Sequence, residues 1–93
     1  METTIRGIIE QYIDRIIQLE SLEQLIIGFQ RFPIKSMENC LFGYVVGSAV
    51  VEYSYLITMI GRQPSIDKMK EFWDIIDRRT MEIRGKIKLA LGK

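Results

Sequence analysis

A polar strip runs along an otherwise apolar stretch of the sequence, residues 40–60. Its members are spaced four, four and three residues apart, so they share one face of a helix: Tyr44, Ser48, Glu52 and Tyr55. Glu52 is the single charge in the stretch. Three interpretations of its carboxylate remain open. It reaches water at the edge of a bundle, or it is buried and paired, or it takes part in catalysis or metal binding.

A buried Glu52 needs a partner. Arg6, Arg15 and Arg79 are the candidate arginines, and tyrosine hydroxyls could also satisfy the carboxylate. A buried pair of this kind fixes helix register or oligomeric state more often than it adds stability.

A metal site would need further carboxylates near Glu52. Glu20 and Glu23 stand three residues apart before the apolar stretch, and Asp74 and Asp77 stand three apart after it. Carboxylates from several helices can hold Mg²⁺ or Mn²⁺, as in all-helical nucleotide hydrolases. The same pairs also fit ordinary surface charge on amphipathic helices. A metal-dependent hydrolase is therefore the second alternative function.

The chain contains no histidine. This absence removes Ser-His and Cys-His nucleophilic pairs, imidazole general bases and histidine metal ligands. The single cysteine, Cys40, can form neither an internal disulfide nor a structural zinc site. We therefore expect a protein with no enzymatic activity and no cofactor. A reducing, cytoplasmic location fits the lone cysteine and an N-terminus without a secretory signal.

Basic residues gather near the C-terminus. Residues 62–93 carry nine Lys or Arg against five Asp or Glu, whereas residues 1–61 carry four against seven. The cations that could contact phosphates are Arg78, Arg79, Arg84, Lys86 and Lys88. Weak nucleic-acid binding is the first alternative function. Cations at a helix C-terminus are also expected from the helix dipole alone.

Three long periodic segments position these residues. Apolar residues three and four apart predict helices at about residues 3–32, 37–60 and 65–91, in one domain that spans residues 1–93. Short connections make successive helices antiparallel. The predicted fold is all-α, an up-down-up bundle of three long helices.

Local signals mark the ends of these helices. Ser21 and Gln24 have the spacing of a capping box, so the first helix could divide near Ser21. Ser36 is predicted to cap the second helix, and Gly61 is predicted to end it. Residues 64–65, Pro-Ser, are a start signal for the third helix.

Residues 40–60 are long enough to cross a bilayer. Glu52 at the centre offsets much of the favourable free energy of membrane insertion that the apolar residues provide. Tyr53 and Tyr55 lie toward the middle of the stretch, whereas tyrosines in membrane helices prefer the two interfaces. The flanking segments are amphipathic and of similar length. We therefore expect a buried central helix in a protein without a membrane span.

The apolar content exceeds what one small protomer can bury. Of 93 residues, 47% are apolar, and sixteen are isoleucine, a usage that also fits a thermophile or an AT-rich genome. Surplus apolar surface usually lies in a subunit interface. We expect a homo-oligomer, with a dimer favoured, that acts through self-association or protein–protein interaction.

The expected interface residues belong to two groups. Residues 66–90 contain an apolar heptad seam, and Gly43-x3-Gly47 offers a small-residue face. The candidates are Gly43, Gly47, Ile66, Met69, Trp73, Ile76, Ile83 and Ile87. Trp73 is the best single candidate for an anchor. On the polar face of the same segment, Asp74 and Arg78 are predicted to pair, being four residues apart.

Overall fold

The computed structural model describes residues 2–62 and 66–92, with side chains at residues 5–62 and 69–92. This part of the chain is helical and contains no strand. Its four helices are α1 (Glu2–Ile16), α2 (Leu19–Phe29), α3 (Met37–Met59) and α4 (Ile66–Ala90). The all-α class is confirmed. The prediction of three helices is wrong, because the first predicted helix is two. The start signal at residues 64–65 lies outside the described residues.

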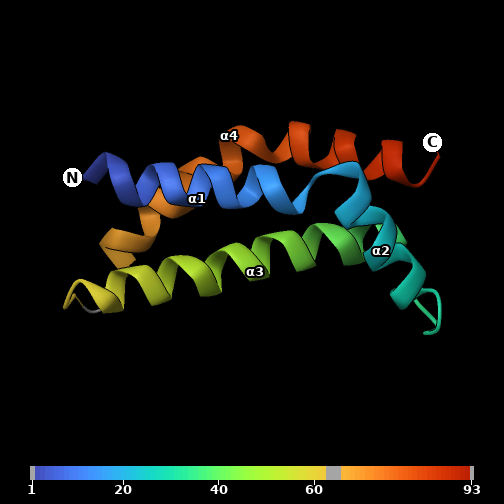
Figure 1. Cartoon of the computed structure of the whole chain (residues 1–93), viewed down its shortest axis with the longest axis horizontal. Coiled ribbons are helices and arrows are strands. Elements are labelled where there is room, and N and C mark those ends of the chain that lie inside the picture. Colours follow the sequence, from blue (N-terminus) through green and yellow to red (C-terminus); the bar gives the residue numbers. More distant parts are fainter. Residues whose placement is uncertain (1, 63–65, 93) are drawn as a thin grey trace.

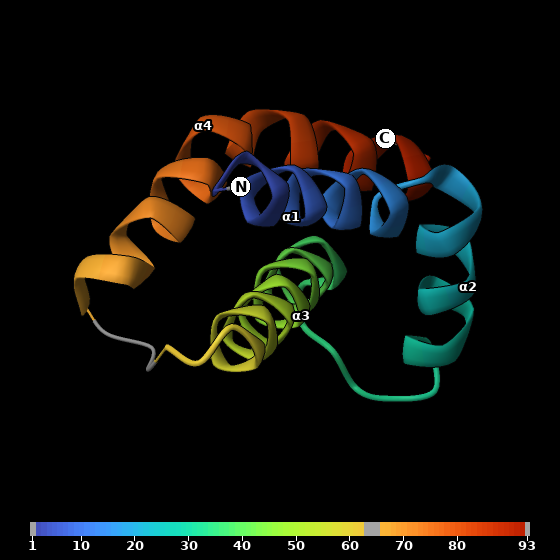
Figure 2. The ribbon, with the colours of Figure 1, turned by 60° about the vertical axis from the view of Figure 1, so that its left-hand side comes forward.

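Helices α1, α3 and α4 lie along the long axis of the molecule and alternate in direction (Figure 1). The shorter α2 turns across one end of the other three, beside the start of α3 and the end of α4 (Figures 1 and 2). It packs against both of these helices. The molecule measures 40 × 22 × 19 Å.

The first predicted helix divides at Ile17 and Gln18, just before the residue that was expected to cap it. Gln18 has an extended backbone, with φ −63° and ψ 146°, and occupies the N-cap position of α2. The Ser21 hydroxyl donates a long hydrogen bond of 3.4 Å to the Arg15 carbonyl, one of the last in α1. The capping-box spacing therefore indicated the break correctly, but Ser21 closes α1 rather than capping α2. The turn buries Leu22 completely.

Both predicted ends of α3 are confirmed. The Ser36 hydroxyl accepts a hydrogen bond of 3.2 Å from the Asn39 backbone N–H. Gly61 has φ +78°, and the N–H groups of Gly61 and Arg62 donate to the carbonyls of Thr58 and Ile57. This is a Schellman ending, which favours glycine because a side chain is strained at positive φ.

The core lies between all four helices. Its buried side chains include Ile9 and Ile13 of α1, Ile17 in the turn after α1, Leu22 of α2 and the inward face of α3. The buried apolar residues of α4 are Phe72, Ile75, Ile76, Ile83 and Ile87. The heptad seam was therefore correct from Ile76 onward. At Trp73 it was wrong by one position, because the curved α4 places Phe72 rather than Trp73 in the core (Figure 2). Phe72 packs in the core against Tyr53, with the two ring centroids 5.4 Å apart, while Trp73 is 43% exposed.

Helix α3 is less buried than the sequence suggested. It is the one helix in the described residues that is long and apolar enough to cross a membrane, judged by length and composition. Only 28% of its most apolar 18-residue window is buried in the protomer. The expectation of a buried central helix is therefore wrong for one side of α3. Neighbouring helices cover the side with Leu41, Val45, Ala49, Tyr53 and Ile57.

Two substitutions on α4 test the assignment of the core. We expect Ile83→Ala to lower the free energy of unfolding by about 2–5 kcal/mol, because Ile83 is completely buried. Met81→Ala is the matched control. Met81 is 87% exposed on the same helix, so its truncation should change stability by less than about 0.5 kcal/mol. Urea unfolding followed by circular dichroism measures both. Equal effects of the two substitutions would contradict the assignment.

Candidate interaction surface

An extended apolar surface lies on the side of α3 that faces away from the other helices. We call it the outer face of α3. Its exposed members are Gly43, Tyr44, Gly47, Val51, Tyr55, Thr58 and Met59. Tyr44 is 41% exposed, Val51 69%, Tyr55 59% and Met59 64%. The outer face contains no charged residue, which is unusual for a surface that meets only water.

Gly43 and Gly47 lie on this outer face and are exposed. A methyl group added to either glycine would meet no atom within 4 Å. The close helix contact that their spacing suggested is therefore absent within the protomer. The two glycines instead leave a shallow, open strip beside larger side chains.

The polar strip has no common partner. Tyr44 and Tyr55 are exposed, whereas Ser48 and Glu52 are half-buried at the edge where α3 meets the other helices. In the described residues, Glu52 makes no hydrogen bond or ion pair. This arrangement fits the first of the three interpretations, in which the strip reaches water.

None of the arginines considered as partners for Glu52 pairs with it. Arg6 lies 3.9 Å from Glu71. The Arg15 guanidinium lies over the Tyr12 ring. Arg79 is bound by three other carboxylates.

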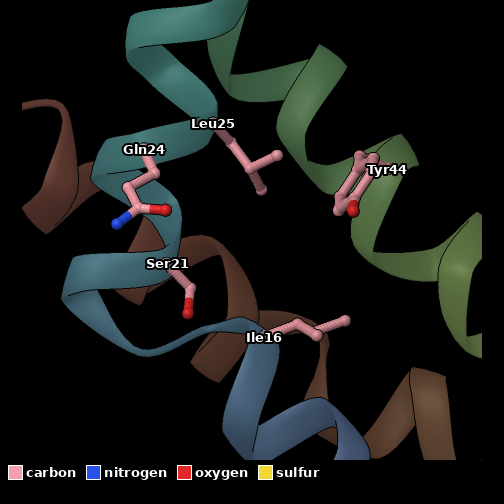
Figure 3. Close-up of a pocket in the computed structure, with 5 residues that line it drawn as sticks. All are labelled: Ile16, Ser21, Gln24, Leu25 and Tyr44. Atoms are coloured by element: carbon pink, nitrogen blue, oxygen red, sulfur yellow. The ribbon is translucent and has the colours of Figure 1, made fainter.

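A pocket of about 390 Å³ adjoins the outer face of α3 (Figure 3). It is lined by Ile16 at the end of α1, by Ser21, Gln24 and Leu25 of α2, and by Tyr44 of α3. The Tyr44 ring also lies edge-on to Phe29, with ring centroids 6.1 Å apart. Tyr44 thus forms both a wall of the pocket and part of the outer face.

The apolar seam of α4 does not form a second exposed face. Ile76, Ile83 and Ile87 are buried within the protomer, so they cannot also serve an interface, and Met69 packs against the core. Trp73 stays partly exposed and contacts Phe72, with ring centroids 5.0 Å apart. The side chain of Ile66 lies outside the described residues. The described seam residues therefore belong mainly to the core, with Trp73 as the exception.

An ionic cluster joins α1 to α4. Arg79 is only 9% exposed. Its guanidinium donates hydrogen bonds to Glu10 at 3.0 Å, to Glu82 at 2.9 and 3.0 Å, and to Asp14. It also donates to the Glu10 backbone carbonyl at 3.1 Å. The hydrogen bond with Glu82 is the largest influence that raises the pKa of Arg79, and Asp14 raises it further.

The basic residues near the C-terminus are mostly engaged inside the protomer. Arg78 pairs with Glu10 and not with Asp74 as predicted. Arg84 contacts Glu38 and Asn39 of α3 and lies 4.1 Å from the centre of the Phe42 ring; its hydrogen bonds to Glu38 and Asn39 are 3.1 and 3.2 Å. These arginines hold α4 against α1 and α3.

Lys86 and Lys88 differ from the arginines. Both are exposed, and neither forms an ion pair with a described residue. Of the five cations considered for phosphate binding, only these two lysines could contact a phosphate without first breaking an ion pair with a described residue.

The carboxylates considered for a metal site do not come together. Within residues 2–62 and 66–92, no group of three or more Cys, Asp or Glu side chains is placed to hold a metal ion. Glu20, Glu23, Asp74 and Asp77 are exposed on α2 and α4.

Comparison of the chain with protein-family models, with curated proteins and with solved structures finds no significant match.

Sequence reasoning missed the ionic cluster around Arg79. The members lie about 65 residues apart along the chain, and no local spacing connects Glu10 and Asp14 with Arg79. One signal was present. Arg79 follows the buried Ile75 and Ile76 by four and three residues, so it falls on the inward side of α4, where an arginine needs carboxylate partners.

The cluster predicts a pH dependence of stability. The hydrogen bond from Arg79 lowers the pKa of Glu82 in the folded protein. This contribution to stability is present above the ordinary glutamate pKa of about 4.3, and it is lost as the pH falls through the lowered value. We expect Glu82→Gln to remove part of the acid-induced loss of stability that the unmodified protein shows.

Urea unfolding at a series of pH values from about 7 to about 3 measures this effect. Glu23→Gln is the matched control, because Glu23 is exposed and makes no ion pair with a described residue. If the free energy of unfolding of the Glu82→Gln and Glu23→Gln variants changes with pH in the same way, the assigned role of Glu82 is wrong.

Proposed function

We propose that this protein acts by self-association, through the outer face of α3, and has no catalytic role. The observation that carries the proposal is the exposure of large apolar side chains along the outer face of α3, which contains no charged residue. Tyr44, Val51, Tyr55 and Met59 are each 41–69% exposed. Exposed apolar area costs about 25 cal/mol per Å² relative to burial. A partner that covers this face is therefore the simplest way to stabilise it.

The size of the face supports a protein partner. The exposed fractions of its members correspond to on the order of 600 Å² per copy, which is near the ~800 Å² that each partner contributes to a standard interface. Soluble monomers rarely expose larger contiguous apolar patches without a function.

A second copy of the chain suits this face better than a lipid surface. Glu52 stands near the centre of the apolar stretch, where a carboxylate is costly in a bilayer. Tyr44 and Tyr55 carry hydroxyl groups along the face, which can hydrogen-bond within a protein interface. The proposal accordingly includes a protein that stays in solution in the cytoplasm without detergent.

Nucleic-acid binding gains less support. Phosphate contacts require several free cations, and binding strength grows with each phosphate that is neutralised. Arg78, Arg79 and Arg84 would each have to leave an internal carboxylate first. Lys86 and Lys88 alone offer a weak, salt-sensitive contact.

Light scattering on a sizing column, in detergent-free buffer at low and high salt, tests the proposal. We expect a discrete species of twice the chain mass of 10.9 kDa at both salt concentrations, because apolar contacts are little affected by screening. Val51→Lys should shift the species to the monomer, since it places a charge at the centre of the outer face.

Met81→Lys is the matched control, because Met81 is exposed on α4 and lies outside the outer face of α3. It should leave the mass unchanged. A monomeric unmodified protein would contradict self-association. A dimer that survives Val51→Lys would move the interface to another surface, and a protein that stays in solution only with detergent would favour a membrane location for α3.

A further inference from the structure

The outer face of α3 has two unlike sides. Cys40 and Thr58 are eighteen residues apart, which is five full turns at 3.6 residues per turn, so they lie on one line along the helix. Tyr44, Val51 and Tyr55 fall within about 60° on one side of this line. Gly43, Gly47 and Ser54 fall within about 60° on the other side. The face therefore has a large side and a small side.

Symmetry decides how these two sides meet in a pair of identical chains. A two-fold axis parallel to α3 produces a parallel helix pair and places the large side of each copy on the small side of the other. A two-fold axis perpendicular to α3 produces an antiparallel pair, in which large meets large and small meets small. The second arrangement crowds one side of the contact and leaves a void on the other, and both faults are destabilising.

We propose that two copies of the chain associate through a parallel, two-fold symmetric contact of α3 with α3. This inference rests on the proposed function and specifies its geometry. Tyr44 of each copy packs over the open strip at Gly43 and Gly47 of the second copy, and Val51 packs beside Gly47 and Ser54. The open space found above both glycines is then filled from outside the protomer.

The face is large enough for a dimer and is suited to no charged partner. Its area of on the order of 600 Å² per copy is within the lower range of stable interfaces. It carries no charge to recognise a nucleic acid or an acidic or basic peptide. The pocket beside Tyr44 lies on the large side of the face and widens the surface that a second copy can reach.

Cysteine cross-linking distinguishes the two arrangements. In a parallel pair each residue on the central line lies opposite its own copy, so diamide oxidation should join Cys40 to Cys40 in the unmodified protein. A second protein, with Cys40→Ser and Thr58→Cys, should also cross-link. A disulfide requires Cα atoms about 4.4–6.8 Å apart, so random collision gives little product.

An antiparallel pair gives the opposite pattern. Neither of these two proteins would cross-link efficiently, but the chain with Thr58→Cys that keeps Cys40 would. Cys40→Ser combined with Met81→Cys, on α4, is the control that should not cross-link in either arrangement. The yield is read on a non-reducing gel at a concentration where light scattering gives a dimer.

A second variant tests the small side directly. Gly47→Val should weaken dimerisation at least about tenfold, because it fills the strip that receives Tyr44 and Val51. Gly85→Val is the matched control, since Gly85 is also exposed, helical and surrounded by open space. It should leave the dimerisation constant unchanged, which sedimentation equilibrium measures.

The outcomes separate this inference from the proposed function. A monomer at all concentrations overturns both. A dimer with the antiparallel cross-linking pattern, or one that tolerates Gly47→Val, overturns the parallel contact and leaves self-association in place. A dimer that cross-links through Cys40 and through Thr58→Cys, and that Gly47→Val weakens, supports both.

Discussion

Helix α3 is apolar around nearly its whole circumference, but the other helices cover only one side of it. The three amphipathic helices turn their apolar faces toward Leu41, Val45, Ala49 and Tyr53, and their polar faces then point to water. No fourth amphipathic face of the described chain remains for the other side of α3. The arrangement of the helices follows from this mismatch between the apolar surface of α3 and the surface that covers it. The fold buries most isoleucines and leaves the outer face of α3 exposed. The exposed apolar surface of α3 therefore results from the helix arrangement as well as from the composition.

Polar contacts then select one arrangement of the covering helices. Apolar burial has little directional preference, whereas the Arg79 guanidinium must meet its carboxylates in a defined geometry. Glu10 and Asp14 of α1 and Glu82 of α4 satisfy it together. The Arg84 guanidinium of α4 likewise donates a hydrogen bond to Glu38 in the first turn of α3. These contacts fix the relative register of three helices, which the isoleucine-rich core alone would leave less well defined.

The helical class, the caps at Ser36 and Gly61 and the later part of the α4 seam could be predicted because each depends on neighbours in the sequence. A break near Ser21 was an alternative to the single long helix that was predicted, and the observed break at Gln18 lies three residues from Ser21, which serves the end of α1 through a local hydrogen bond. The exposure of α3 could not be predicted, because periodicity is uninformative in a helix that is apolar on every side. The choice of Phe72 over Trp73 for the core depends on the curvature of α4 around α3, which Figure 2 shows and no local pattern encodes. The partners of Arg79 depend on contacts across about 65 residues of chain.

The direction of the α3 pair also bears on the basic residues at the end of α4. In the proposed parallel dimer the C-terminal ends of both copies would lie at the same end of the assembly, so Lys86 and Lys88 of each chain would share that end. Helix α2 crosses the same end of the protomer (Figure 1) and carries Glu20 and Glu23, which are exposed. Each copy therefore adds two carboxylates along with its two lysines. The segment between α2 and α3 adds two exposed cations, Arg31 and Lys35, so this end carries mixed charge, and a phosphate backbone would meet repulsion as well as attraction there. Because α4 packs on the side of α3 opposite the outer face, the proposed pairing would not join the lysines of two copies into one basic patch.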